Sequence, residues 1–199
     1  MHLRPAFTET DSARIAGLIA ANPFGLLVTC GESGMQGSHV PFVMTQDNDD
    51  IVLPGHLAAG NAQCAAFDGG AALAVFAGPH AYISPGWYRT QPAVPTWDYT
   101  AVHVHGHLQR LDEEALADML RALARGDPGG FDLDELESGF RDGLLAGIRG
   151  FRLWAERIEA QWKMSQNRSA ADREGVVAAL RASGEHAVAD LVAGTLPAG

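Results

Sequence analysis

TAVHVHGHLQRL, residues 100–111, alternates between apolar and polar side chains more cleanly than any other stretch of the sequence. The alternation separates an apolar set from a polar set: Val102, Val104, Gly106 and Leu108 against His103, His105, His107 and Gln109. Successive residues of a strand point to opposite faces of a sheet, so the stretch predicts a β-strand with one buried face.

The segments around this strand predict further strands and a few helices. Apolar runs typical of strands occupy residues 25–30, 35–44, 51–54, 71–76 and 150–162, and GESG (31–34) predicts a hairpin turn between the first two. Pro41 cannot donate to a ladder, so the second strand is expected at a sheet edge or at a bulge near His39. Helices are expected from Asp112, from Asp132 to about Ile148, and over residues 55–67 directly after a strand.

This order of elements favours an antiparallel sheet, because too few helices separate the strands for a parallel one. We therefore expect an α+β protein, mainly antiparallel β, in which a closed barrel has helices beside it. The barrel domain is expected over residues 1–169, with inserted helices at about 112–148, and a helical tail over 170–199. Gly139, Gly143 and Gly147 follow one another at four-residue spacing in the second inserted helix; close packing and chance in a chain with 23 glycines explain this equally well.

Residues 78–97, GPHAYISPGWYRTQPAVPTW, show neither helical nor strand periodicity and predict a long loop. Such loops are uncommon in compact domains and are usually functional. We expect packing of the aromatic side chains, rather than backbone ladders, to hold this loop: Tyr82, Trp87, Tyr88 and Trp97.

Composition narrows the classes of function. The 199 residues carry a formal net charge of −10, which disfavours direct tight binding of DNA. Cys30 and Cys64 form no CxxC pair and fit small buried residues in a reducing compartment rather than a redox or zinc site. No apolar stretch approaches the length of a membrane span, so a cytoplasmic protein is expected.

Three groups of residues can carry chemistry. His103 and His105 point the same way on a strand and could share a metal ion, although a plain polar barrel face is the favoured interpretation. The expected helix start at residues 55–61 suits a phosphate, with His56 in its first turn and Asn61 about one turn further on; a simple surface cap explains it equally well. WKMSQNR, residues 162–168, combines an aromatic ring, an ammonium group and two amides, the types that a flavin ring and its phosphate require, although a strand end with a polar turn is the commoner outcome.

Taken together, several motifs resemble the PaiB family of FMN-binding negative transcriptional regulators. The resemblance covers nearly the whole chain and includes these segments: ANPFGLLVT (21–29), SHVP (38–41), GHLA (55–58) with Asn61, FAGPHAYISPGWY (76–88), VPTWDY (94–99) with VHVHG (102–106), and WKMSQNR followed by REGV (173–176). The two longest motifs are unusual enough to make chance agreement very improbable.

The resemblance implies an FMN-binding split β-barrel with flanking helices and a helical C-terminal tail, usually a homodimer with the flavin between subunits. It implies that Ser38, His39 and Val40 line the flavin and that His56 takes its phosphate. It further implies that the long loop, with Tyr82 and Trp97, and the segment with Lys163, Gln166 and Asn167 complete or cover the site. Asn61 is expected beside the phosphate.

This sequence also departs from the family pattern. Asp98 stands where asparagine is expected, and His105 and His107 stand where other residues are more frequent. A carboxylate beside an anionic cofactor would weaken its binding, so FMN is the expected cofactor without being certain to be retained.

These features leave three functions open. One is an FMN-dependent oxidoreductase acting on a small molecule, and one is a regulator that lowers transcription directly or through a partner. The third is a haem- or metal-handling barrel that uses His103 and His105. The tail has a helix-turn-helix outline, yet its second helix has no Lys or Arg to contact phosphates, so direct DNA binding is doubtful.

Overall fold

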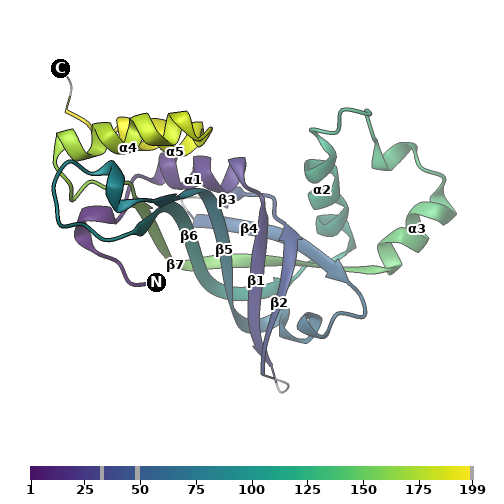
Figure 1. Ribbon diagram of the computed structural model, residues 1–199. Coiled ribbons are helices and arrows are strands. Elements are labelled where there is room, and N and C mark those ends of the chain that lie inside the picture. Colours follow the sequence, from purple (N-terminus) through teal and green to yellow (C-terminus); the bar gives the residue numbers. More distant parts are fainter. Residues whose placement is uncertain (32–33, 48–49, 198–199) are drawn as a thin grey trace. The chain divides into compact units, whose positions relative to one another are not determined.

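The computed structural model describes residues 1–31, 34–47 and 50–197, so Glu32 and Ser33 of the expected hairpin turn and Asp49 lie outside the described residues. The chain divides into two compact units. Unit 1 contains Met1–Leu18, Ala77–Val102 and Glu159–Gly199, and unit 2 contains Ile19–Phe76 and His103–Ile158. Figure 1 labels the elements of both units.

Seven strands form one sheet in the order β2-β1-β5-β6-β7-β4-β3. Their bounds are Phe24–Gly31 (β1), Gly34–Pro41 (β2), Thr45–Asp47 (β3), Asp50–Ala58 (β4), Asp68–Ile83 (β5), Thr96–Arg110 (β6) and Ile148–Lys163 (β7). β1 pairs antiparallel with β2 and with β5, and β4 pairs antiparallel with β3 and with β7. The expected antiparallel fold is confirmed, and Pro41 lies in β2 at the edge of the sheet, where its missing N–H costs no ladder bond.

The sheet curls within unit 2 until β2 meets β4, although four strands lie between them in the order. An ideal Cβ on Gly55 of β4 would lie 3.0 Å from Val40 Cγ1 of β2 and 2.8 Å from the Phe151 ring, so glycine permits this close approach. Inside the curl, Phe42 packs edge to face on Phe76 and on Phe151, with ring centroids 5.3 and 5.9 Å apart. The barrel core is therefore aromatic and closed by contact between non-adjacent strands.

β6 confirms the alternation on which the sequence prediction rests. Val102, Val104 and Leu108 have no exposed surface, whereas the histidines between them are partly or fully exposed. Gly106 lies on the same buried face, where there is no space for a side chain. An ideal Cβ there would lie 1.8 Å from the backbone oxygen of Trp154 on β7.

Short helices connect and flank the strands. They are η1 (Pro5–Phe7), α1 (Ser12–Ala21), η2 (Ala62–Ala66), η3 (Pro85–Trp87), α2 (Glu113–Ala124), η4 (Leu133–Glu135), α3 (Ser138–Ala146), α4 (Ala170–Ala182) and α5 (His186–Ala193). Asp112 caps α2 by accepting from the backbone N–H of Ala115 at 2.9 Å, as its position before the helix predicts. Among the described residues, no helix combines the length and apolarity that a membrane span requires.

Three sequence predictions about elements are wrong. The helix expected over residues 55–67 is strand up to Ala58, because β4 continues its pairing with β7 there, and only η2 follows it. The loop expected from Gly78 is strand up to Ile83. The helix expected from Asp132 to Ile148 is interrupted: Asp132 caps η4, and Glu137 caps a separate α3.

Unit 1 has its own apolar core around the C-terminal helices. Side chains of α4 and α5, including Val176, Leu180 and Val192, are fully buried with Ile83 of β5 and Tyr88 of the loop. The expected helical tail is thus part of a packed unit that also contains the ends of three long strands.

Candidate functional site

The residues expected at the cofactor fall into two groups, one in each unit. Unit 2 holds Ser38, His39, Val40, His56 and Asn61, and unit 1 holds Tyr82, Trp97, Lys163, Gln166 and Asn167.

In unit 2, the structure brings Ser38 and Asn61 together. The Asn61 amide Nδ2 donates to Ser38 Oγ at 3.0 Å, while Asn61 Oδ1 accepts from the backbone N–H of Gln63 at the start of η2. The Ser38 hydroxyl accepts in this bond, so its own proton remains available for an acceptor such as a phosphate oxygen.

Gln63 fixes this arrangement from beneath, although the sequence analysis did not single it out. Its side chain is 2 % exposed, and Nε2 lies within hydrogen-bond distance of Thr29 Oγ1 at 3.0 Å and of the backbone oxygens of Leu27 and Gln36. Because Gln63 links η2 to β1 and β2, it holds Asn61 beside Ser38. The only sequence signal for it is its place two residues after an Asn that caps a turn.

His39 and Val40 lie on opposite sides of β2. The His39 ring is exposed and stacks on the exposed Phe24 ring, with centroids 5.6 Å apart. Val40 is 1 % exposed and packs into the barrel, so only its backbone can face a cofactor.

His56 lies in β4 opposite Gly150 of β7, and so outside any helix start. The phosphate argument from a helix N-terminus is therefore wrong for this residue. Its ring atom Nδ1 is buried and has no hydrogen-bond partner among the described residues, and burial lowers the pKa of His56 below its usual 6.5. A neutral imidazole with an unsatisfied nitrogen fits a ligand that supplies the missing partner.

In unit 1, the structure brings Tyr82, Trp97 and Lys163 together. The exposed rings of Tyr82 and Trp97 meet edge to face with centroids 6.0 Å apart, and the ring centroids of His80 and Trp97 lie 6.2 Å apart. Lys163 donates to Thr96 Oγ1 and to the backbone oxygen of Trp97. The result is an exposed aromatic surface with an ammonium group at its edge.

Gln166 and Asn167 lie in the turn that follows β7. Gln166 Oε1 accepts from the backbone N–H of Met164 at 2.6 Å, and its Nε2 donates to Trp162 O, so its amide holds the turn after β7. Asn167 is exposed.

Asp98, where the sequence departs from the family pattern, is fully buried in unit 1. Ser165 Oγ donates to its Oδ2 at 2.7 Å, and Lys163 Nζ lies 3.8 Å from Oδ1. Burial raises the pKa of Asp98, against the opposing effects of Ser165 and Lys163, and burial also lowers the pKa of Lys163. The carboxylate thus belongs to an internal polar cluster and does not extend from the surface toward a cofactor.

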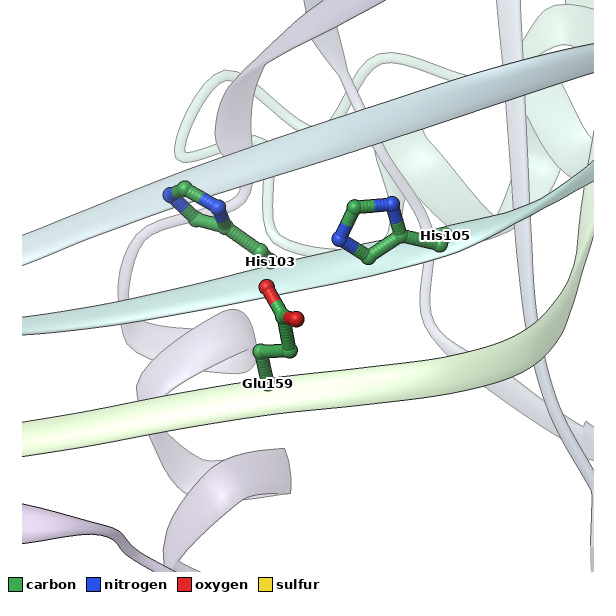
Figure 2. A group of neighbouring side chains, drawn as sticks. All are labelled: His103, His105 and Glu159. Atoms are coloured by element: carbon green, nitrogen blue, oxygen red, sulfur yellow. The ribbon is translucent and has the colours of Figure 1, made fainter. Parts of the chain in front are cut away.

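His103 and His105 lie on the same face of β6, with ring centroids 6.5 Å apart (Figure 2). Figure 2 also draws Glu159, a residue of β7 whose carboxylate pairs with the N-terminal amine of Met1 within unit 1. His107, the third histidine of the stripe, lies 2.9 Å from Glu156 Oε1 at the surface.

Comparison with known proteins identifies the family to which this chain is similar. A family model described as "Putative FMN-binding domain" matches residues 1–157. "Protease synthase and sporulation protein PAI 2" of Bacillus subtilis is 33% identical over 186 residues, covering 91% of this chain and 89% of that protein. An uncharacterised protein of Aspergillus fumigatus is 30% identical over 233 residues, covering 89% of each chain.

Solved structures share the fold at low identity. The flavocytochrome Anf3 of Azotobacter vinelandii matches with a TM-score of 0.60 at 10% identity, covering 81% of this chain and 72% of its own. The FAD and haem binding protein of Mycobacterium smegmatis matches with a TM-score of 0.58 at 12% identity, covering 78% and 73%. These similarities confirm the split-barrel architecture.

Proposed function

The chain belongs to the PaiB family of FMN-binding split-barrel proteins, and from that premise we propose that it binds FMN through the polar group of unit 2. The observation that carries the proposal is the buried Nδ1 of His56, which has no hydrogen-bond partner among the described residues; the Ser38 hydroxyl, which accepts from Asn61, is the second candidate donor. A phosphate supplies acceptors for such donors, and buried polar atoms without partners are rare in proteins. When bound, FMN would supply the redox chemistry, and the protein residues would position it.

The aromatic group of unit 1 suits a different part of a flavin. Exposed rings such as Tyr82 and Trp97 can stack on an isoalloxazine ring, and the Lys163 ammonium can donate to ring carbonyls. We assign Ser38, His56 and Asn61 to the phosphate and Tyr82, Trp97 and Lys163 to the ring as separate proposals, each with its own variants.

Titration with FMN and with riboflavin, which lacks the phosphate, tests both proposals. Loss of one charge-assisted hydrogen bond costs about 1.5–3 kcal/mol, so Ser38→Ala and His56→Ala should each weaken FMN binding about tenfold or more and leave riboflavin binding unchanged. Trp97→Ala should weaken both flavins alike. Ser183→Ala, which removes a hydroxyl that donates to Leu180 O, is the matched control.

Protein that shows no flavin absorption bands after incubation with FMN, and no quenching of flavin fluorescence, would contradict the proposed function. If Ser38→Ala weakened the binding of FMN and of riboflavin equally, this would contradict only the assignment of Ser38 to the phosphate.

Two activities fit such a protein: an FMN-dependent oxidoreductase acting on a small molecule, and a negative regulator of transcription. We propose that any regulatory effect acts through a ligand or partner, because the net charge is −10 and α5 carries no Lys or Arg. A specific gel shift at low salt with the upstream DNA of its own gene would contradict this.

We further propose a homodimer that uses exposed aromatic side chains of unit 1. Tyr82 is 47% exposed and Trp97 is 54% exposed, and large aromatic residues frequently dominate such interfaces. The cytoplasmic location expected from the sequence likewise stays a proposal.

Haem or metal handling by His103 and His105 is the alternative function. The proximity of the two rings on β6 favours it. Elemental analysis and a haem spectrum of the purified protein test it, and a stoichiometric metal lost in His103→Ala would support it.

A further inference from the structure

Unit 2 contains a cavity that shares no residue with the proposed flavin groups. It lies between α2 and the strands β3, β4 and β7, and its volume is about 540 Å³, within the usual range for small-molecule sites. Its walls are mostly apolar and include Val43, Val52, Met119 and Ala122.

Two guanidinium groups line this apolar cavity. Arg152, partly buried on β7, has a buried Nε with no hydrogen-bond partner, and its guanidinium lies 5.9 Å from the centroid of the Trp154 ring. Arg125 follows the last residue of α2 and is exposed at the rim. Among the side chains that the structure describes, neither arginine forms an ion pair.

One carboxylate also lines the cavity, and it is paired with a different arginine. This carboxylate is Asp118, and Arg121, on the same helix, binds its Oδ1 at 2.7 Å. The cavity therefore carries two positive charges whose counter-ion is not a described side chain. An unpaired buried guanidinium N–H is costly, and the guanidinium fork matches a carboxylate or a sulfonate.

We propose that this cavity binds a small organic anion with an apolar body, its acidic group on Arg125 and Arg152 and its body against α2. The indole of Trp154 and the side chains of Val43, Val52 and Met119 supply the surface for the apolar part. This ligand site is separate from the flavin and does not depend on flavin binding.

Two fluorescent probes that share a naphthylamine body test the charge requirement. 1-Anilinonaphthalene-8-sulfonate carries a sulfonate, and N-phenyl-1-naphthylamine carries none. Because each arginine contributes a charge-assisted hydrogen bond, Arg125→Gln and Arg152→Gln should each weaken binding of the anionic probe about tenfold, with the neutral probe unchanged. Added salt should weaken only the anionic probe.

Two further variants complete the design. Arg141→Gln, on α3 and outside this cavity, removes the same charge from the same unit and should change neither probe. Ala122→Trp places an indole in the cavity and should abolish binding of the anionic probe, with folding checked by circular dichroism.

The proposal is overturned if the wild-type protein does not bind the anionic probe, or if it binds with equal affinity in Arg125→Gln, Arg152→Gln and the wild type. Binding that persists in a folded Ala122→Trp variant would also overturn it, since the probe would then occupy another surface. Flavin titration of the same variants separates this result from the proposed function, because FMN affinity should stay unchanged in all of them.

Discussion

Asp98 holds a carboxyl group where no water reaches it. Its partners are the Ser165 hydroxyl at 2.7 Å and the Lys163 ammonium at 3.8 Å, and one of its oxygens, Oδ1, has no hydrogen-bond partner among the described residues. Burial raises the pKa of Asp98 above 3.8. The folded protein therefore holds this proton more tightly than the unfolded chain does.

This raised pKa gives the Asp98 contribution to stability a definite pH dependence. The contribution is fully present below pH 3.8 and is lost as the pH rises through the raised pKa of the folded state. In Asp98→Asn, which can keep the bond from Ser165, that loss should disappear. The free energy of unfolding of the variant minus that of the wild type should therefore increase with pH.

Urea unfolding at a series of pH values measures this difference. Asp190→Asn, in which the lost carboxylate is exposed and pairs with Arg181 at the surface, is the control. Parallel pH profiles for Asp98→Asn and the wild type would show that burial does not control this carboxyl group.

At the scale of single elements, two helix glycines have opposite surroundings. An ideal Cβ on Gly175 of α4 would lie 2.3 Å from the backbone oxygen of Trp87, whereas one on Gly143 of α3 would meet nothing within 4 Å. Close packing therefore explains Gly175, which the family motif contains, and does not explain the glycine spacing in α3.

Alanine substitution should separate these two cases. Gly175→Ala should destabilise the protein by about 1–3 kcal/mol, because a backbone atom must move to make room. Gly143→Ala should stabilise it by up to about 1 kcal/mol, because alanine has the higher helix propensity. Thermal unfolding of both variants measures the difference, and the same sign for both would contradict it.

The loop after η3 is held by one carboxylate as well as by aromatic packing. Asp172, 2 % exposed on α4, accepts from the backbone N–H groups of Arg89 and Thr90 at 2.8 Å each, and these bonds lower the pKa of Asp172. Tyr88 is buried as the sequence predicts, while Tyr82 and Trp97 are exposed and do not anchor the loop.

Asp172→Ala should therefore release the loop. Two backbone donors lose their acceptor, at a cost of about 1–3 kcal/mol, and cleavage near Arg89 should become faster in limited proteolysis by trypsin. Asp142→Ala, at an exposed position of α3, should leave the cleavage rate unchanged. Unchanged cleavage in Asp172→Ala would assign the anchoring to aromatic packing alone.

Local sequence patterns correctly predict those strands and helices whose apolar periodicity and capping residues both indicate the same element. The alternation of residues 100–111 and the cap at Asp112 specify β6 and α2 from short-range information. Residues 55–58 are strand instead because Ala58 pairs with Ile148, a partner far along the chain that no local pattern reveals. The helix expected from Asp132 ends early because Glu137 supplies a second cap within the same apolar periodicity.

The candidate site is predictable in its residue types and less so in its geometry. Ser38 and Asn61 meet because Gln63 ties η2 to β1 and β2, a contact set by the tertiary fold. Arg125 and Arg152 line the same cavity because α2 lies beside β7 in the fold. Their spacing in the sequence does not predict this arrangement.

The exposed aromatic surface of unit 1 is the proposed contact between two copies of the protein. If Trp97 is an interface residue, Trp97→Ala should weaken dimerisation by about 2 kcal/mol or more, roughly 30-fold in the dissociation constant. Sedimentation velocity over a range of protein concentrations measures this. Phe140→Ala removes a comparably exposed ring from α3 in unit 2 and should leave association unchanged.

A monomeric wild-type protein, or an unchanged dimer in Trp97→Ala, would remove the proposed interface. The riboflavin titration of the same variant then shows whether Trp97 serves the flavin ring independently of association.

The two units are completed at different times while the chain is synthesised. Every segment of unit 2 has been synthesised once Ile158 is made, whereas unit 1 still awaits Glu159–Gly199. The first residues of the chain find their partners only then: Thr8 bridges to Gln161, and Glu9 donates its backbone N–H to Ala160 O. A nascent chain stalled before Glu159 would therefore present its N-terminal segment without these partners, which makes that segment the expected binding site for chaperones until Glu159–Gly199 are synthesised.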